Sequence, residues 1–448
     1  MTASWKDLFP LAIAAVLVLV SAVPYELTYG GGGSPSGPPS ARTPVQHVVE
    51  IMMENHAFDN FFGTFPGVVG FPANASVPNG TGGSVPPYWI SGDSTPDLPH
   101  DRASEIADLD GGRMDGFVEE MAKYNASAPE TPMGYYNATQ IGGYWTLAKD
   151  FVLCDMYFQP ALGPTLPNRL YAIAGSSAGL TSDTWPSTPV DLTTIFDELT
   201  AAGIPWRYYY QPGEGLPVPL HVVPLSTDPA EVKNVVPMTG LLSDIDAGAL
   251  PSVTFIDPEG SNTTSEHPPQ NVTVGEEWSL SIIDAIETSS LWNSTAIFLT
   301  WDEGGGFYDS VVPPVVDSLG DGFRVPMIVI SPFTEGAGVD STTLDHTSVL
   351  KFIDQNWGLP YLDARVADTQ SMGLVFHFDA GSGDARAGVR TLPPSGESHF
   401  GSGTLVASTI AIAAPGSPRR PGSRALRRSG GRGSTSRPAP VISHRERA

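Results

Sequence analysis

The 448-residue sequence has a single cysteine and few basic residues for its length. One thiol excludes an internal disulfide framework, and the apolar neighbours of Cys154 predict a buried strand thiol rather than a nucleophile. Within positions 1–414 lie only 14 of the 23 basic residues but 47 of the 48 acidic ones. This imbalance argues against nucleic-acid binding and against attraction to an anionic membrane. There is no internal repeat.

Long apolar runs are equally scarce, and the one near the N-terminus is informative. Lys6 precedes the apolar run Leu8–Val23, which ends in small residues, as in an export signal. A bilayer span takes about 20 residues, so this run leaves both a cleaved signal peptide and an N-terminal membrane anchor open for residues 1–24. Residues 25–44, rich in Gly, Ser and Pro, are predicted to be a flexible linker.

The other end of the chain and its glycosylation motifs complete this outline. Residues 377–448 form a low-complexity, basic segment with a short apolar stretch, Thr404–Ala414, and are predicted to be a disordered tail. Seven Asn-x-Ser/Thr sequons predict a glycosylated protein that is extracellular or on the cell surface. Their asparagines are Asn74, Asn79, Asn125, Asn137, Asn262, Asn271 and Asn293.

Between these ends, residues 45–376 alternate strand-like and helix-like patterns. Expected strands are Val45–Met53, Val152–Asp155, Ile204–Tyr210, Val253–Asp257, Thr295–Trp301 and Arg324–Ser331, and expected helices are Asp191–Ala202, Glu276–Ser289 and His346–Trp357. Such alternation predicts an α/β fold with a mostly parallel sheet flanked by helices. The Gly/Pro-rich span Phe71–Asp97 is expected to be a loop or lid.

Polar residues follow three of the predicted strands. Glu54 and Asn55 come directly after one strand, and Asp302 and Glu303 follow another and precede a triple glycine. Glycines let the backbone turn sharply and approach another segment closely. Thr165 stands on a Gly-Pro turn before a helix expected to begin near Pro167. Since ligand sites in such sheets lie beyond the carboxyl ends of the strands, we expect these side chains to share one site.

The residue types indicate a metal site with a hydroxyl nucleophile. A threonine hydroxyl is weakly nucleophilic until a base or a metal activates it. Glu54, Asn55, Asp302 and Glu303 offer oxygen ligands for a divalent cation such as Mg²⁺, Mn²⁺, Ca²⁺ or Zn²⁺, with Thr165 as a further ligand. The residues alone leave open a second reading, in which Thr165 is only a helix N-cap.

Five separated motifs, in order, resemble the phosphoesterase family, which includes bacterial phospholipases C, plant non-specific phospholipases C and AcpA-type acid phosphatases. The resemblance covers roughly residues 45–360. The motifs are Glu54–Asp59 with Phe62-Gly63, Gly112–Phe117, Gly163–Thr165 with Pro167–Arg169, Ser265–Pro268, and Asp302–Asp309. The family implies an alkaline-phosphatase-like three-layer sandwich.

The resemblance also implies roles for single residues. It makes Thr165 the nucleophile, places His267 and His100 as catalytic residues at the phosphate, and assigns Asn55 and Arg169 to substrate binding. Histidine suits protonation of a leaving oxygen near neutral pH. Two positions depart from the family pattern, because Gly304 and Ser310 replace histidines.

These observations favour a secreted or surface-tethered, metal-dependent phosphoric ester hydrolase with a phosphothreonine intermediate. Its expected substrate is a phosphate ester or a phospholipid headgroup, and the sequence does not separate phospholipase C from acid phosphatase. The missing histidines keep open an inactive, glycosylated surface protein with the same fold. A sulfatase is disfavoured because no C-x-P-x-R motif is present.

Overall fold

A computed structural model describes residues 38–378, apart from 212–216, 225–228, 230 and 259–262. The predicted segment 1–24, most of the linker 25–44 and nearly all of the tail 377–448 therefore lie outside the described residues. In the described part, no helix is both long and apolar enough to cross a membrane. The predicted boundaries of these segments stay predictions.

An eight-stranded sheet organises the structure, in the order β13-β6-β12-β11-β1-β10-β8-β9. Only β12 runs antiparallel to its neighbours, and every other neighbouring pair in the sheet is parallel. Its strands are β1 His47–Met53, β6 Val152–Cys154, β8 Trp206–Tyr210, β9 Val235–Pro237, β10 Val253–Asp257, β11 Thr295–Trp301, β12 Met327–Ile330 and β13 Gly338–Asp340. This confirms the mostly parallel α/β sheet.

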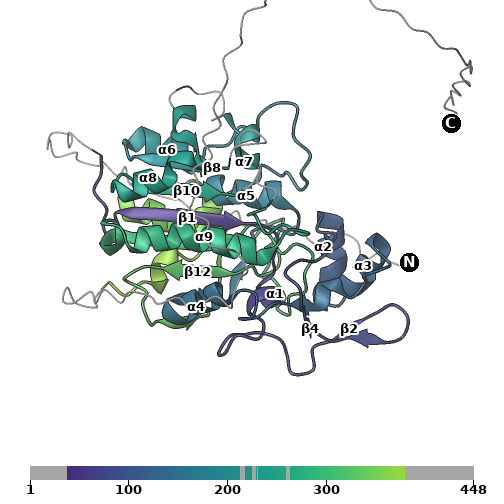
Figure 1. Cartoon of the computed structure of the whole chain (residues 1–448). Coiled ribbons are helices and arrows are strands. Elements are labelled where there is room, and N and C mark those ends of the chain that lie inside the picture. The colour runs from purple at the N-terminus through teal and green to yellow at the C-terminus, as the bar shows by residue number, and fades with distance from the viewer. Residues whose placement is uncertain (1–37, 212–216, 225–228, 230, 259–262, 379–448) are drawn as a thin grey trace, which may run out of the picture. The chain divides into compact units, whose positions relative to one another are not determined.

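Two groups of helices flank the sheet. Helix α5 packs against α6, α7 and α10, and α9 packs against α4 and α8. The helices are α1 Phe58–Phe62, α2 Arg102–Leu109, α3 Phe117–Tyr124, α4 Gly142–Asp150, α5 Thr165–Ala174, α6 Ile195–Ala202, α7 Val218–Val222, α8 Leu241–Asp246, α9 Val272–Glu287, α10 His346–Trp357 and α11 Ala364–Asp368. Figure 1 shows α9 running along the direction of β1, and α8 at the opposite end of β1 from α2 and α3.

Local sequence explains the ends of these elements. Helices α6 and α10 end at Gly203 and Gly358, which take the left-handed conformation that favours glycine. Strands β10 and β11 and helix α10 have the predicted bounds, whereas α9 starts four residues early because Asn271 caps it. Helix α5 begins at Thr165, two residues before the predicted start near Pro167, and Pro164 takes the N-cap position.

The Gly/Pro-rich excursion lies beyond the carboxyl end of β1, beside α2 and α3 (Figure 1). It is mostly loop, as expected, with short strands β2 Val77–Pro78, β3 Ser84–Val85 and β4 Tyr88–Trp89, the last pairing with β5 Gly134–Tyr135. A further small pair, β7 Tyr157–Phe158 and β14 Leu344–Asp345, connects the segment before α5 with the start of α10. The excursion thus covers the edge at which the parallel strands end.

Candidate active site

Two polar pairs, Glu54-Asn55 and Asp302-Glu303, meet where the central strands β1 and β11 end. These strands are parallel neighbours, and their last residues, Met53 and Trp301, are partners in register. The next residues are held together as well: Asp302 N donates to Met53 O at 3.1 Å, and Asn55 N donates to Asp302 Oδ1 at 3.3 Å. Glu54, Asn55, Asp302 and Glu303 are all buried. The structure therefore brings together four of the five residues that the sequence proposed as metal ligands, and the fifth, Thr165, is the first residue of α5.

The glycines after Glu303 allow this close approach. Gly305 has a φ of +64°, and a Cβ atom on it would lie 2.2 Å from the Asn55 carbonyl oxygen. Gly306 has a φ of +74°, and its Cβ would lie 2.6 Å from the Pro99 carbonyl oxygen. Since Pro99 precedes His100, the same turn holds the segment with His100 next to the two polar pairs. A side chain at either glycine would push these segments apart.

Arg169 lies in the middle of the acidic group. Its Nε donates to Asp302 Oδ2 at 2.9 Å, its Nη2 lies 3.2 Å from Glu54 Oε1, and its Nη1 lies 2.8 Å from Asp257 Oδ2. The guanidinium is buried with all three carboxylates. Its observed contacts are therefore those of a counter-ion, whereas the sequence had assigned it to substrate. Asp257 ends strand β10 and was missed, although it satisfies the same strand-end rule.

Thr165 opens helix α5 and is half-buried. No side-chain hydrogen bond caps this helix, so the N-cap reading of Thr165 is wrong. Arg169 follows four residues later, which puts both residues on one face of the helix, with Cβ atoms about 5–6 Å apart. The next backbone group, Leu166 N, donates to Asp183 Oδ1 at 2.8 Å. Asp183, a loop residue missed from the sequence, therefore occupies an N–H group that could bind an anion.

The electrostatics of the site leave its carboxylates short of positive charge. Burial raises the pKa of Glu54 to about 7, although Arg169 opposes the shift. Burial, reinforced by the neighbouring Asp302, raises the pKa of Glu303 well above its usual value. One guanidinium thus pairs with the carboxylates of Glu54, Asp257 and Asp302, while the buried Glu303 lies next to Asp302 in the chain. A bound cation would favour their charged forms.

Two buried oxygens of the site have no hydrogen-bond partner among the described residues: Asn55 Oδ1 and Glu303 Oε1. Burying such atoms without a partner costs free energy, so native structures usually satisfy them. Both belong to the expected ligand set, which contains only oxygen donors. The residues present therefore fit a hard divalent cation.

The two predicted histidines lie beside this group. His100 donates through Nδ1 to Leu98 O at 2.7 Å, and its Nε2 lies 3.3 Å from Asn55 Nδ2 and 4.0 Å from Glu303 Oε1. His267 donates through Nδ1 to the Pro268 carbonyl at 2.7 Å. In each ring, the carbonyl contact places a proton on Nδ1, so Nε2 is the acceptor nitrogen of the neutral imidazole, and in His100 this atom faces Asn55 Nδ2. The two rings stand edge to face, with centroids 5.5 Å apart.

Asp97 joins these histidines in a second group that could hold a metal. One ligand atom from each of Asp97, His100 and His267 lies within 4.8 Å of the others. Mixed imidazole and carboxylate ligands suit Zn²⁺ better than Mg²⁺ or Ca²⁺. A cation can therefore be accommodated by the oxygen group or by this group. Asp97 was not among the residues predicted from sequence.

Further residues that the sequence did not mark support the site. Gln159 Oε1 accepts from Gly304 N at 2.8 Å, and a Cβ on Gly304 would lie 3.3 Å from that oxygen. His346 donates through Nε2 to the Asp302 carbonyl at 2.9 Å, and burial lowers the pKa of this imidazole to about 4. Both act across long sequence separations. No local pattern could have found them.

The second departure from the family pattern lies in a separate buried cluster. Arg324 pairs through Nε with Asp309 at 2.9 Å and through Nη2 with Asp59 at 3.1 Å. Ser310 N donates to the other carboxylate oxygen of Asp59 at 2.8 Å. The aspartates that end two of the motifs therefore pack the structure together through one arginine.

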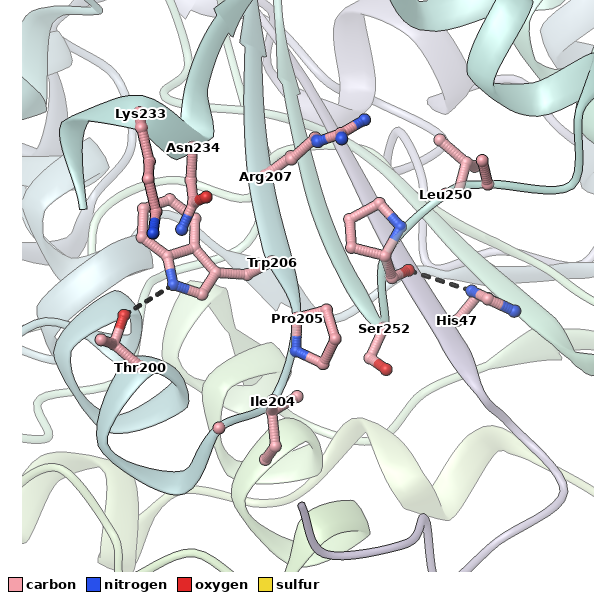
Figure 2. A pocket seen from close by; sticks show the side chains of 13 residues that line it. His47, Thr200, Ile204, Pro205, Trp206, Arg207, Lys233, Asn234, Leu250 and Ser252 are labelled. Carbon is pink, nitrogen blue, oxygen red and sulfur yellow. Dashed lines mark hydrogen bonds between the residues drawn. The ribbon is translucent and has the colours of Figure 1, made fainter. Parts of the chain in front are cut away.

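A cavity of about 560 Å³ lies at the other edge of the sheet, where β1, β8 and β10 begin (Figure 2). Figure 2 shows His47 donating to the Pro251 carbonyl (3.0 Å) and Trp206 to Thr200 (2.9 Å). This cavity is lined by none of the predicted site residues. Its histidine and its indole already form hydrogen bonds within the protein. We therefore take the group of charged and metal-ligand side chains at the carboxyl ends of β1 and β11 as the candidate active site.

The fold and the site together define an α/β protein with a cation-competent acidic site beside a helix N-terminus. A model of the phosphoesterase family matches residues 45–360, and the chain belongs to this family. Membership confirms the resemblance drawn from the five motifs, and it supports a phosphoric ester hydrolase.

Individual relatives agree with this assignment. The chain is 30% identical to the non-hemolytic phospholipase C of Pseudomonas aeruginosa over 70% of its length, but it spans only 54% of that relative. It is 29% identical to phospholipase C A of Mycobacterium tuberculosis, covering 78% of both chains. The non-specific phospholipase C6 of Arabidopsis thaliana is 28% identical over 69% of this chain and 67% of its own.

A solved alkaline phosphatase superfamily protein from Vibrio parahaemolyticus aligns with 75% of this chain and 72% of its own, at 10% identity and a TM-score of 0.39. The sheet topology and the family membership carry the fold assignment.

Proposed function

We propose that this protein is a divalent-metal-dependent phosphoric ester hydrolase whose catalytic domain spans residues 45–376. One observation carries the proposal: Glu54, Asn55, Asp302 and Glu303 converge, and two of their buried oxygens have no partner in the described structure. A divalent cation held by these oxygens would neutralise phosphate charge and favour an alkoxide. The Asp97 group is an alternative position for a cation.

Thr165 is the proposed nucleophile. Its Oγ1 would attack phosphorus while the bond from phosphorus to the leaving oxygen breaks, which gives a phosphothreonine. A water molecule would then hydrolyse this ester and restore the hydroxyl. The α5 N-terminus provides backbone N–H groups for a phosphate oxygen once the Asp183 carboxylate moves off Leu166 N.

His100 and His267 are the proposed general acid and general base. Each ring has its Nδ1 proton fixed by a backbone carbonyl. Nε2 is therefore the atom that can carry a proton to the leaving oxygen or accept one from the attacking water. Asn55 Nδ2, 3.3 Å from His100 Nε2, would orient that ring and contact substrate. Arg169 would act mainly through the carboxylates that it pairs with.

We propose a phosphodiester of the phospholipid headgroup type as substrate. The relatives named above are phospholipases C, which supports this substrate class. The acidic body favours zwitterionic over anionic headgroups.

A location outside the cell fits the sequons. The six described sequon asparagines are all exposed or half-buried, so each is open to glycosylation. The N-terminal run, Leu8–Val23, would supply the signal or tether.

One experiment tests the proposal directly. The purified protein is assayed with p-nitrophenylphosphorylcholine and p-nitrophenyl phosphate, each with and without EDTA. We expect faster hydrolysis of the diester, loss of activity with EDTA and recovery with one divalent cation. Activity indifferent to EDTA, in protein without bound metal, would rule out the metal-dependent mechanism. A preference for the monoester would instead indicate a phosphatase.

A further inference from the structure

An apolar tip projects from the loop that follows the site turn. It consists of Val312, Val315 and Val316, which are 51%, 89% and 49% exposed. Val315 has the highest exposed fraction of the large hydrophobic side chains in the described residues. Single exposed apolar residues are ordinary, but three within five positions form a patch that needs an explanation.

Ion pairs order the base of this loop. The exposure of its tip is therefore a feature of an ordered loop. Arg365 pairs with Asp317 at 3.1 Å and also with Asp321 and Asp345. Asp317 Oδ1 in turn accepts from Leu319 N and Gly320 N, and Asp321 N donates to the Pro314 carbonyl at 3.0 Å. A surface ordered in advance loses little conformational entropy on binding.

Both ends of the loop are attached to the candidate active site. It leaves the turn that carries Asp302 and Glu303, and it returns at Gly322, whose N–H donates to Gln159 O at 2.8 Å. The side chain of Gln159 holds Gly304 N at 2.8 Å, directly after Glu303. Both ends of the loop that carries the tip are therefore held by the same segments that hold the Asp302-Glu303 turn.

The charges of the loop select its partner. Within residues 310–321 the only charged side chains are Asp317 and Asp321, and Arg365 pairs with both. The tip thus offers apolar surface without basic residues, and the surrounding body is acidic. Such a surface has no attraction for an anionic bilayer, whereas valines can enter the interface of a neutral one.

We propose that this apolar tip inserts into the interface of a zwitterionic phospholipid bilayer and holds the active site at the headgroups. The inference rests on the proposed function, and it deepens it by naming the physical form of the substrate. Hydrophobic burial of the valines supplies the binding free energy. A soluble diester needs no such contact. Loss of the tip should therefore slow hydrolysis of vesicles but not of a soluble diester.

A position-specific label tests insertion without relying on turnover. In the full chain, Val315→Cys can be labelled with an environment-sensitive fluorophore, because the native Cys154 is buried. Leu242→Cys is the matched control: Leu242 is 55% exposed on α8, at the opposite end of β1 (Figure 1). With phosphatidylcholine vesicles we expect a saturable blue shift at position 315 and none at 242. The N-terminal segment is the same in both proteins.

A functional pair of assays completes the test. We expect the double variant Val315→Asp/Val316→Asp to hydrolyse phosphatidylcholine vesicles about tenfold more slowly, the equivalent of about 1.4 kcal/mol of binding. Its rate on p-nitrophenylphosphorylcholine and its Tm should match the parent, because these residues face solvent.

No blue shift at position 315, or an equal one at 242, would overturn the inference. So would a double variant that keeps its rate on vesicles. Wild-type protein that hydrolyses neither substrate would refute the proposed function instead, and the label would still report whether the tip inserts.

Discussion

The Nε atom of Arg169 donates to Asp302 Oδ2 at 2.9 Å inside a group of carboxylates that is otherwise short of positive charge. The same guanidinium contacts Glu54 and Asp257. A cation bound by Glu54 and Asp302 would therefore share its ligands with this arginine. Arg169 and such a cation would complement each other, because the arginine alone leaves the buried acids short of positive charge.

Replacing Arg169 by alanine should strongly destabilise the protein. Removing one partner of a buried ion pair leaves charge uncompensated and typically costs about 3–5 kcal/mol. Arg207→Ala is the control, because Arg207 pairs with Asp244 at the surface, where such pairs contribute about 1 kcal/mol or less. Chemical denaturation of both variants in EDTA gives the comparison. Equal losses would show that the buried group does not depend on Arg169.

Thr165→Ala should lower kcat by several orders of magnitude, as expected when a nucleophile is lost. Its Tm should stay near that of the parent, because Thr165 does not cap helix α5. Thr165→Ser should keep measurable activity, since the hydroxyl remains. The measurements are kcat with p-nitrophenylphosphorylcholine and a thermal melt of each variant. A Thr165→Ala protein with near-normal kcat would exclude the phosphothreonine intermediate.

Gly305→Ala should abolish activity, because its Cβ would lie 2.2 Å from the Asn55 carbonyl oxygen and would separate the two polar pairs, Glu54-Asn55 and Asp302-Glu303. Gly336→Ala is a closely matched control. Its φ of +70° is similar, but a Cβ there meets nothing within 4 Å. We expect the control to cost about 1 kcal/mol of stability and no activity. If both variants behave alike, the close approach at Gly305 is not what assembles the site.

Glu50 should make the protein less stable as the pH rises. It lies in the middle of β1, buried, with neither carboxylate oxygen hydrogen-bonded in the described structure. Burial raises the pKa of this side chain to about 8 from an ordinary value of 4.5. A raised folded-state pKa favours the protonated form, so its contribution is complete below pH 4.5 and is lost as the pH rises through 8. Glu50→Gln should remove this dependence and stabilise the protein at pH 9 by a few kcal/mol, as urea denaturation at pH 5, 7 and 9 would measure. If Glu50→Gln had the same pH dependence of stability as the parent, the prediction would be contradicted.

A divalent cation should stabilise EDTA-treated protein. Binding at a hundred times the dissociation constant adds about 2.7 kcal/mol, which a thermal melt detects without any substrate. Glu303→Gln should weaken this stabilisation, because it removes a ligand whose Oε1 has no partner in the described structure. Glu335→Gln, at an exposed surface position, should respond like the parent. A melt indifferent to every divalent cation would contradict the metal site.

The sequence alone specified the elements whose patterns are local. The apolar run before Glu54 and the run before Asp302 predicted β1 and β11 because strands buried on both faces need continuous apolar residues. Because ligand sites lie beyond the carboxyl ends of parallel strands, the sequence then placed the two polar pairs at one edge of the sheet. The sequence also predicted α10 with its bounds, since Gly358 stops it.

Only the tertiary structure decided which distant residues complete the site. These residues meet in the antiparallel pairing of β12, the contact of Arg169 with Asp257, the hydrogen bond of Asp183 at the start of α5, and the hydrogen bonds of Gln159 and His346. The partners in these contacts are 17 to 145 positions apart in the sequence. Periodicity and spacing act within one element, whereas these contacts arise when elements pack, so no local pattern specifies them. The sequence thus determined what chemistry is available, and packing determined which carboxylates Arg169 pairs with.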